Sequence, residues 1–384
     1  MTTLRIPFSP PSITDQEVDA VAEALRSGWI TTGPRTRAFE EAIRERCQAK
    51  AALGVNSCTA ALHLALVALG IGPGDEVAVP VMTFCSSANV VLHVGATPVP
   101  VDVEPDTLNI CPRSLATALT PRTKAVIAVH FAGHPVDLDA IRAVLPPSGI
   151  HLIEDAAHAI GAAIGDVPIG GTGNPTAFSF YATKNLATGE GGMLLGAQDL
   201  VERTRTLALH GMSKDAWKRY GGGPWRYDVA EPGFKYNMTD IQAALGMVQL
   251  ERFEAMQAVR YRAVDAYRRV LVDCDLIELP TQRAGITHAW HLFVVRLNTD
   301  ALTIGRDQVI EALSEAGIGT SVHFIPLHCH SFYREQLGWR RGQAPVADAQ
   351  WLRALSLPLH GALSEADASE VASVLRACLE RHRR

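Results

Sequence analysis

Apolar positions near the start of the chain recur at the spacing of a helix. Val18, Val21 and Leu25 follow Thr14-Asp-Gln-Glu17, in which the hydroxyl and the later glutamate have the spacing of a capping box. Gly28 then interrupts the pattern, as a residue after a helix often does. We expect a helix that starts after Thr14 and ends near Gly28.

Between about residues 51 and 197, short runs of β-forming residues alternate with helical segments such as 60–69 and 138–145. This alternation predicts an α/β fold with a mostly parallel sheet covered by helices on both faces. Ligands of such sheets bind at the carboxyl ends of the strands. The expected strands are residues 76–79, 98–102, 125–129, 151–154, 177–180 and 193–195.

A long helical pattern from about residue 239 to 272 leads out of this region, with Ile241, Leu245, Val248 and Phe253 on one face. It predicts a bridge to a smaller C-terminal α+β domain. We divide the chain into residues 1–254, the large domain, and 255–384, the small one. The small domain is expected to contain a strand at 291–297, a helix at 308–315, an extended segment at 318–324 and a final helix at 365–380.

Composition restricts the class of protein. The chain has 384 residues, a net charge of -5 and 47% hydrophobic residues, which predicts a globular protein without the basic surface that nucleic acid requires. Residues 1–7 lack the apolar core of a signal peptide, and no run reaches the roughly 18 apolar residues of a membrane span, so we expect a cytoplasmic protein. Seven scattered cysteines without a C-x-x-C pair predict neither disulfides nor a zinc ribbon.

Lys184 is the strongest candidate for a catalytic residue. It lies in Phe178-Ser-Phe-Tyr-Ala-Thr-Lys-Asn185, shortly before Thr188-Gly-Glu-Gly-Gly192. A lysine in a dry, glycine-lined pocket loses part of its basicity and can form a Schiff base. Asp155 ends another expected strand, where it could keep a pyridine nitrogen protonated, as pyridoxal phosphate requires. The alternative for Asp155 is an acid that caps a turn.

A phosphate site is indicated where Asn56-Ser-Cys-Thr-Ala-Ala-Leu-His63 starts a helix, because helix N-termini bind anions. Cys58 and Thr59 would form it, and Ser179 could add a hydroxyl, although any helix cap resembles this pattern. Phe84 could stack on a flat ring or could be a core residue.

Two further stretches are candidates for substrate contacts. Trp29 and Thr31 lie in an irregular segment, Trp29-Ile-Thr-Thr-Gly-Pro34, which either borders a substrate or packs on a neighbour. His323 and His328 belong to a histidine-rich segment that invites a metal interpretation. We do not favour a metal, because Pro326 breaks helical ligand spacing and no carboxylate lies nearby in the sequence.

Together these motifs resemble the DegT/DnrJ/EryC1/StrS family of sugar aminotransferases, which are fold-type I pyridoxal-phosphate enzymes with a mostly parallel seven-stranded sheet. The resemblance extends over essentially the whole chain. Further motifs that carry it are Ser27-Gly-Trp-Ile-Thr-Thr-Gly-Pro34, Gly70-Ile-Gly-Pro-Gly-Asp-Glu-Val77, Ile153-Glu-Asp-Ala-Ala-His-Ala159, Gly233-Phe-Lys-Tyr-Asn-Met-Thr-Asp240 and Leu355-Ser-Leu-Pro-Leu359.

The resemblance implies roles for single residues. Lys184 would carry the Schiff base, Asp155 would pair with the pyridine nitrogen, and His158 would lie beside the cofactor as a catalytic or hydroxyl-binding residue. The phosphate would be held by Thr59, Ser179 and the Cys58 backbone, and Phe84 would stack on the ring. Members of the family form homodimers with shared sites, so Asn237 would reach the other subunit's phosphate, although some relatives have arginine there.

The resemblance also implies a reaction. Relatives that dehydrate a sugar replace the lysine with histidine, so Lys184 favours amino transfer. We expect L-glutamate as donor and a nucleotide-linked keto-sugar as acceptor. Residues 210–217 resemble those of relatives that aminate C-4 of a dTDP- or UDP-4-keto-6-deoxyhexose. The partner chain's 323–330 segment is a further candidate for contact with the sugar. A C-3 keto-sugar or keto-cyclitol substrate is the alternative, and a non-catalytic sensor that binds pyridoxal phosphate is a third.

Overall fold

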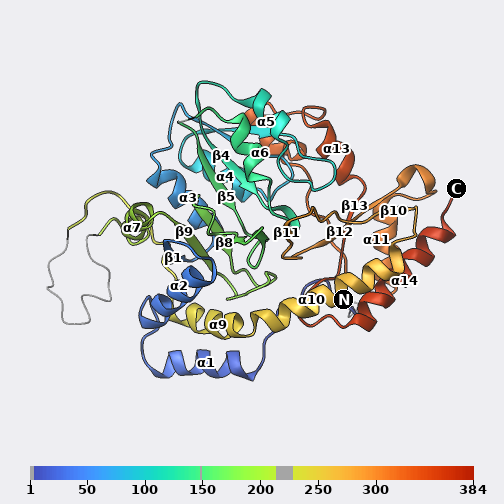
Figure 1. Ribbon diagram of the computed structural model, residues 1–384, viewed down its shortest axis with the longest axis horizontal. Coiled ribbons are helices and arrows are strands. Elements are labelled where there is room, and N and C mark those ends of the chain that lie inside the picture. Colours follow the sequence, from blue (N-terminus) through green and yellow to red (C-terminus); the bar gives the residue numbers. More distant parts are fainter. Residues whose placement is uncertain (1–3, 148, 213–227) are drawn as a thin grey trace.

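The computed structural model describes residues 4–147, 149–212 and 228–384. Its centre is a seven-stranded sheet in the order β1-β9-β8-β5-β4-β2-β3 (Figure 1). Only β9 runs antiparallel to its neighbours, so the expected mostly parallel sheet is confirmed. In sheet order the strands are Ala51–Val55, Gly192–Gly196, Thr176–Ser179, His151–Asp155, Thr123–Val129, Glu76–Pro80 and Thr97–Val101.

All six strands expected from the sequence belong to this sheet, and β1 is an additional one. Ala51-Ala-Leu-Gly-Val55 is short and contains alanine and glycine, which are uncommon in strands, so its β-propensity is weak. Its five residues are nevertheless buried. Pairing with β9 and burial therefore decide its conformation.

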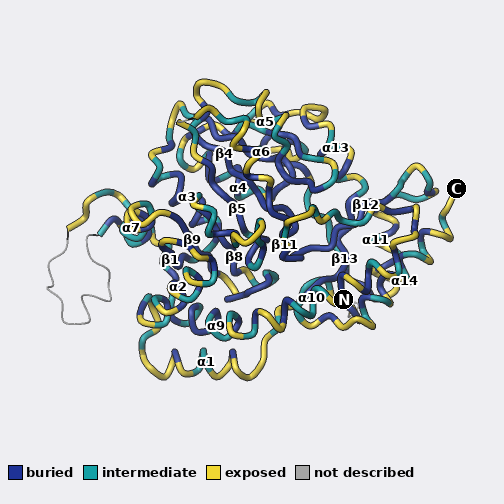
Figure 2. Tube along the Cα trace, viewed as in Figure 1, coloured by how far each residue is buried: buried dark blue, intermediate teal, exposed yellow. Residues whose placement is uncertain are grey.

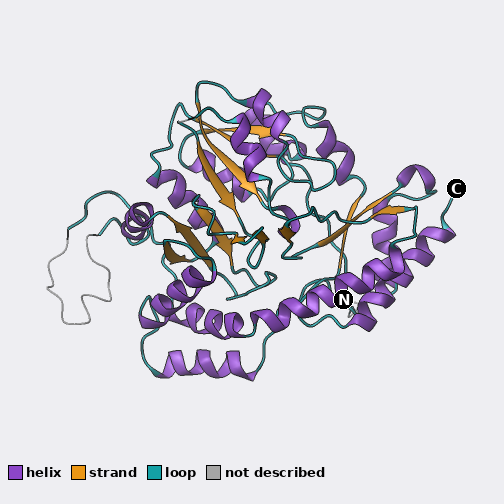
Figure 3. Cartoon of the chain, viewed as in Figure 1, coloured by secondary structure: helices purple, strands orange, loops and turns teal. Residues whose placement is uncertain are grey.

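Helices cover both faces of the sheet, as Figure 3 shows. The capping box at Thr14 is confirmed, since its side chain and that of Glu17 satisfy each other's backbone groups at the start of α1. The helix α2, which begins with proline, was not expected. The helices of this part are α1 Asp15–Arg26, α2 Pro34–Arg46, α3 Cys58–Ala68, α4 Ser86–His93, α5 Pro112–Ala118, α6 Leu138–Val144 and α7 Gln198–Leu207, with the short η1 Phe131–Gly133.

The long helix expected from about 239 to 272 is two helices, α9 Asp240–Glu251 and α10 Phe253–Leu271. The two helices are separated at Arg252, and neither glycine nor proline marks the break in the sequence. The chain beyond contains the small sheet β10-β12-β13, and its strand β11 pairs with β6 of the preceding part in a second small sheet, β11-β6-β7. The remaining elements are β6 Ala163–Ile164, β7 Val167–Pro168, β10 Ile277–Glu278, β11 Ile286–Thr287, β12 Phe293–Leu297, η2 Thr299–Ala301, α11 Arg306–Glu315, η3 Leu327–Cys329, α12 Ser331–Leu337, α13 Pro345–Trp351, β13 Ala354–Leu357 and α14 Glu365–Arg381.

The C-terminal part has a core of its own, in which Tyr267, Phe293 and Leu375 are buried between α10, β12 and α14. The expected extended segment 318–324 forms only isolated bridges, one of them between Ser321 and Ser356. The division of the chain at residue 254 stays a prediction.

One stretch of the C-terminal part packs back on the large sheet. Leu327, Tyr333 and Trp339 are buried in the same cluster as α3 and the strands β1, β2 and β4. This return brings His323 and Phe324 to the carboxyl ends of the parallel strands. Burial is concentrated in the central strands (Figure 2). Within the described residues, none of the helices combines the length and the apolar character that a membrane crossing requires.

Candidate active site

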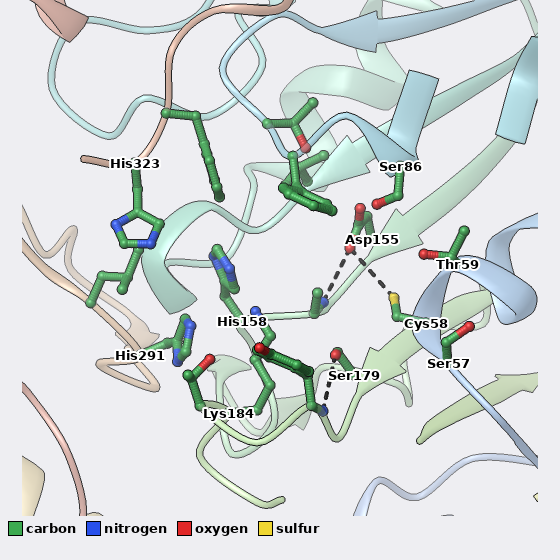
Figure 4. Close-up of a pocket in the computed structure, with 18 of the residues that line it drawn as sticks. Ser57, Cys58, Thr59, Ser86, Asp155, His158, Ser179, Lys184, His291 and His323 are labelled. Atoms are coloured by element: carbon green, nitrogen blue, oxygen red, sulfur yellow. Dashed lines mark hydrogen bonds between the residues drawn. The ribbon is translucent and has the colours of Figure 1, made fainter. Parts of the chain in front are cut away.

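A cavity of about 510 Å³ opens at the carboxyl ends of β4, β5 and β8. Its wall includes the N-terminus of α3, the loop before α4, the turn after β8, and residues 323 and 324 (Figure 4). Eight of the predicted site residues line it, namely Cys58, Thr59, Phe84, Asp155, His158, Ser179, Lys184 and His323. Strand ends remote in sequence thus meet at one site, as expected for a parallel sheet.

Asp155 is the last residue of β5 and is buried at the cavity. The hydroxyl of Ser87, in α4, donates to its Oδ2 over 2.7 Å. The backbone N–H of Ala157 donates to its Oδ1 over 3.2 Å, and Sγ of Cys58 lies 3.8 Å from the same oxygen. Asp155 therefore does cap the turn that follows it, but its carboxylate also faces the cavity with a fixed orientation.

Lys184 lies in the turn that follows β8, and its backbone N–H donates to the carbonyl of Tyr181. Burial lowers the pKa of the amine from 10.5 to about 8, while the neighbouring Cys58 and Asp155 oppose the shift. A substantial part of the amine is therefore neutral near pH 8, as nucleophilic attack on an aldehyde requires.

The first turn of α3 forms another wall. Ser57 caps the helix, and its hydroxyl accepts from the N–H of Ala60 over 3.1 Å. Gly192 lets β9 approach this turn, because a Cβ there would lie 2.4 Å from the backbone of Ser57. The helix N-terminus, the Thr59 side chain and the Ser179 hydroxyl together suit an anion.

The thiol of Cys58 is not suited to nucleophilic attack. Burial and the neighbouring Asp155 raise its pKa well above the ordinary value, although Lys184 opposes this. The sulfur lies 3.4 Å from the carbonyl of Ala177, to which it can donate. Cys58 thus fills space under the cavity as a protonated donor.

Phe84 is 59% exposed at the rim of the cavity, so the interpretation as a core residue is wrong. Its ring centroid lies 6.3 Å from that of Phe324, which lines the same cavity. The ring is therefore available to a flat ligand.

Three histidines lie on the opposite side of the cavity, as Figure 4 shows. The ring centroids of His158 and His291 are 4.3 Å apart, and Nδ1 of His158 is buried without a hydrogen-bond partner. Burial lowers the pKa of His158 well below 6.5, with Lys184 and His323 adding to the shift. Burial and Lys184 lower the pKa of His323 to about 4. At neutral pH these imidazoles are uncharged.

His323 and Phe324 line the cavity of their own chain. Contact of their segment with the sugar in the partner's site stays a prediction. Nδ1 of His323 lies 2.8 Å from the hydroxyl of Ser356, which leaves the other ring nitrogen for the cavity.

His328, Trp29, Thr31 and Asn237 are not among the residues that line this cavity. His328 is fully buried, with Nε2 2.8 Å from a carboxylate oxygen of Asp348. The indole of Trp29 donates to the carbonyl of Thr32, and the amide of Asn237 donates to the hydroxyl of the same residue. The irregular segment 29–34 and Asn237 therefore pack together, away from Lys184.

The sequence did not favour a metal around His328, because no carboxylate lies nearby in the sequence. In the structure a carboxylate from a distant part of the chain lies beside it. Asp348 comes from α13, and ligand atoms of His328, Cys329 and Asp348 lie within 4.8 Å of one another. The Asp348 carboxylate already accepts from Gly342 N–H over 2.7 Å besides its contact with the imidazole. These contacts are those of a structural hydrogen-bonded pair.

Sequence reasoning missed Ser57, Ser86, His291 and Phe324 in the cavity wall. Ser57 could have been found, since a serine directly before a helix is the usual cap. His291 had no such signal, because it precedes β12 and reads as the start of a strand.

The site suits pyridoxal phosphate. An anionic side chain, Asp155, and a weakly basic amine, Lys184, line the same cavity as a helix N-terminus with hydroxyls beside it. These are the groups that the pyridine nitrogen, the aldehyde and the phosphate of this cofactor require. The fold and the site together define a fold-type I pyridoxal-phosphate enzyme.

Comparisons with known proteins agree. The model of the DegT/DnrJ/EryC1/StrS aminotransferase family matches residues 11–376. The chain is 47% identical over 374 residues to the spore coat polysaccharide biosynthesis protein SpsC of Bacillus subtilis, covering 97% of this chain and 96% of SpsC. It therefore belongs to this family and is a pyridoxal-phosphate-dependent sugar aminotransferase.

Solved structures extend the comparison. Spr1654 from Streptococcus pneumoniae, assigned to the sugar aminotransferases and solved in its PMP form, superposes with a TM-score of 0.92 at 36% identity, covering 98% of this chain and 100% of that chain. The same protein is known in its PLP form. DesV from S. venezuelae, in complex with a ketimine intermediate, gives a TM-score of 0.88 at 34% identity, covering 98% and 99% of the two chains.

Proposed function

We propose that this enzyme transfers the amino group of L-glutamate to a nucleotide-linked keto-sugar, at C-4 of a dTDP- or UDP-4-keto-6-deoxyhexose. The observation that carries the proposal is that Lys184, with a pKa of about 8, lines one cavity with Asp155. The relationship to SpsC, named for polysaccharide biosynthesis, supports an activated sugar as acceptor. The choice of C-4 rests on residues 210–217, most of which lie outside the described residues.

When bound, pyridoxal phosphate supplies an aldehyde that condenses with amines and a ring that accepts the electron pair of a broken C–H bond. Asp155 keeps the ring nitrogen protonated through its fixed carboxylate. Lys184 would hold the aldehyde, and its amine would move a proton from the donor Cα to the cofactor carbon and, in the second half-reaction, in the reverse direction. The N-terminus of α3, Thr59 and Ser179 would hold the phosphate, and Phe84 would contact the ring.

The active unit that we propose is a homodimer whose sites are shared. Val18, Leu25 and Ile30, on α1 and the segment after it, are between 52% and 58% exposed and form apolar surface that a second copy can cover. Asn237, which does not line its own cavity, would face the partner's phosphate. Lys235, whose ammonium contacts the Asn237 side chain, would bring a positive charge with it.

The charge of the cavity supports an active site that is shared by two subunits. Among its described lining residues, Lys184 is the one lysine or arginine. A glutamate donor and a cofactor phosphate both carry negative charge, so a second cation from the partner chain would stabilise them. We place this dimer in the cytoplasm, as a prediction.

The proposed reaction is tested with the holoenzyme in two half-reactions. L-Glutamate should change the visible absorption of the bound cofactor, and a nucleotide-linked 4-keto-6-deoxyhexose should restore it and appear as the amino sugar. If the enzyme aminated only C-3 keto-sugars or only keto-cyclitols, the proposed acceptor would be wrong. An absorption band that no amino donor changes would support a sensor and contradict the enzyme.

A further inference from the structure

The backbone that carries His291 is strained. Trp290 has φ 47° and Ala132 has φ 57°, a region that residues other than glycine rarely adopt. The two segments are joined, because the N–H of His291 donates to the carbonyl of Ala132 over 3.0 Å. Strain of this kind persists where surrounding contacts impose it and gathers at functional sites. The fold thus holds His291 in one position in the cavity wall.

Other contacts hold the same segment from behind. The guanidinium of Arg260, in α10, donates to the carbonyls of Trp290 and Leu359 over 3.4 Å and 2.9 Å. Gly133, with φ 95°, allows close approach, since a Cβ there would lie 2.8 Å from the carbonyl of His158 and 3.2 Å from the N–H of His291. A side chain at residue 133 would therefore push the segments of His158 and His291 apart.

The side chain of Asn185 fixes the tautomer of His291. Nδ2 of Asn185 donates to the carbonyl of Ala289 over 2.7 Å, and a carbonyl can only accept, so the orientation of the amide is settled. Oδ1 of Asn185 then faces Nδ1 of His291 at 3.1 Å. Nδ1 must carry the proton, and Nε2 keeps its lone pair.

Gln257 secures this arrangement. Its Nε2 donates to the carbonyl of Ala289 over 2.8 Å, so its Oε1 is the atom that faces Nδ2 of Asn185 at 3.3 Å. All three side chains are buried. Asn185 follows Lys184 directly in the chain, so the same network ties the catalytic turn to His291.

The charged and titratable groups around His291 keep it neutral. Burial lowers the pKa of its imidazole well below 6.5, and His158, Lys184, Arg260 and His323 all act in the same direction. No acid is among the causes of the shift. Nε2 is therefore an acceptor at neutral pH.

We propose that His291 is a specificity-determining residue whose Nε2 accepts a hydrogen bond from a hydroxyl of the sugar acceptor. This inference rests on the proposed function. A lone pair attracts an O–H group and repels a carboxylate, so glutamate gains nothing from this atom, whereas a hydroxylated keto-sugar does. Asn185 acts through His291 as a positioning residue.

The proposal is tested with His291→Asn, whose amide can still donate to Asn185 but has no acceptor at the Nε2 position. The kcat/KM of the holoenzyme is compared for the keto-sugar and for its monodeoxy analogues. In the natural enzyme one hydroxyl should contribute about 3- to 10-fold, as a neutral hydrogen bond does. In His291→Asn the ratio of kcat/KM for the keto-sugar to kcat/KM for that monodeoxy analogue should fall to near unity. The glutamate half-reaction should keep its rate.

Two outcomes would overturn the proposal. One is a variant that keeps the natural ratio at every hydroxyl. The other is an equal loss in both half-reactions, which would show that His291 serves Lys184 or the cofactor. If the natural enzyme responds to glutamate but aminates no keto-sugar, the proposed function is wrong. The tautomer of His291 can still be tested independently in that case.

Nitrogen-15 NMR of histidine-labelled holoenzyme reads the tautomer directly. His291 should be neutral with its proton on Nδ1 at pH 7, and a proton on Nε2 or an imidazolium would refute the proposal. Asn185→Asp places a carboxylate beside Nδ1, which favours the imidazolium. In this variant the ring should keep its second proton to a higher pH than in the natural enzyme, which the same spectra measure.

Discussion

The hydroxyl of Ser87 donates to Oδ2 of Asp155 over 2.7 Å, although the two residues belong to different strand–helix units. Ser87 lies in α4, is fully buried, and has its oxygen 2.8 Å from the Thr83 hydroxyl. A hydrogen bond to a carboxylate is stronger than one between neutral groups. The chain Thr83–Ser87–Asp155 therefore holds the acid in one orientation at the cavity, where we propose that it pairs with the ring nitrogen.

Removal of this hydroxyl should weaken cofactor binding. We expect Ser87→Ala to raise the Kd of pyridoxal phosphate by at least about tenfold, because a hydrogen bond to a charged group contributes about 1.5 to 3 kcal/mol. Titration of the apoenzyme with the cofactor measures the change. Ser373→Ala, which removes an exposed hydroxyl on α14, is the control and should leave Kd unchanged. Equal affinities of Ser87→Ala and the natural enzyme would contradict the proposed support.

The approach of Gly192 to the start of α3 gives a second prediction. A methyl group at this position would meet the Ser57 carbonyl carbon at 2.4 Å and the Cys58 nitrogen at 2.6 Å, and both atoms belong to the backbone. Gly192→Ala must therefore shift the turn that we propose binds the phosphate. We expect at least a tenfold higher Kd for the cofactor and a loss of about 1 to 3 kcal/mol of stability, the usual cost of overpacking.

Gly72→Ala is the matched control. The nearest atom to a Cβ there is the Val94 carbonyl oxygen at 3.8 Å, an ordinary contact. This variant should bind the cofactor like the natural enzyme. Inorganic phosphate, which competes for the same turn, should protect the natural apoenzyme from thermal unfolding more than Gly192→Ala. Identical protection of both proteins would place the phosphate elsewhere.

The pKa of Lys184 gives a prediction about stability. Burial lowers it from 10.5 to about 8, so the charged amine destabilises the folded apoenzyme. Between pH 8 and 10.5 the unfolded chain binds more protons than the folded chain. The stability of the folded apoenzyme therefore rises with pH from about 8 to 10.5. Below pH 8 the amine is charged in both states, and the full destabilisation of the folded apoenzyme is present.

Lys184→Met should remove that cost, because it replaces the amine with an apolar chain of similar length. We expect the apoenzyme to gain up to about 3 kcal/mol in urea unfolding at pH 7, since one pKa unit corresponds to 1.36 kcal/mol. The gain should shrink above pH 8. A gain of the same size at pH 7 and pH 10 would show that packing rather than charge is responsible. Borohydride should attach no cofactor to this variant.

The parts of the site that could be predicted are those fixed by local sequence. Asp155, Ser179 and Lys184 each stand at or just after a run of β-forming residues, and parallel strands bring such ends together. Thr59 follows a serine that has the chemistry of a helix cap. Their meeting in one cavity follows from topology alone.

His291 could not be predicted, for a physical reason. Its position depends on left-handed conformations at Trp290 and Ala132, which these residue types disfavour. Its tautomer depends on Asn185, which is distant in sequence. The break at Arg252 has no sequence signal either, whereas α2 could have been found from Pro34, since proline favours the first helical position.

Asn237 provides the test of the shared site. It pairs with Thr32 and Lys235 and does not line the cavity of its own chain. If it serves the partner's phosphate, Asn237→Ala should lose most of its amino transfer, as Lys184→Ala does. Light scattering should give a dimer for both variants, since neither change alters the apolar surface of α1.

A mixture of the two inactive variants, unfolded and refolded together, should regain activity. Random pairing makes half of the dimers mixed, and each mixed dimer has one site with both Lys184 and Asn237 intact, so about a quarter of the natural activity should return. A site built from one chain would regain nothing, because each chain lacks one of the two residues. Natural enzyme that is refolded in the same way corrects for losses in the procedure, and recovery clearly above a quarter would mean that Asn237→Ala alone is not impaired.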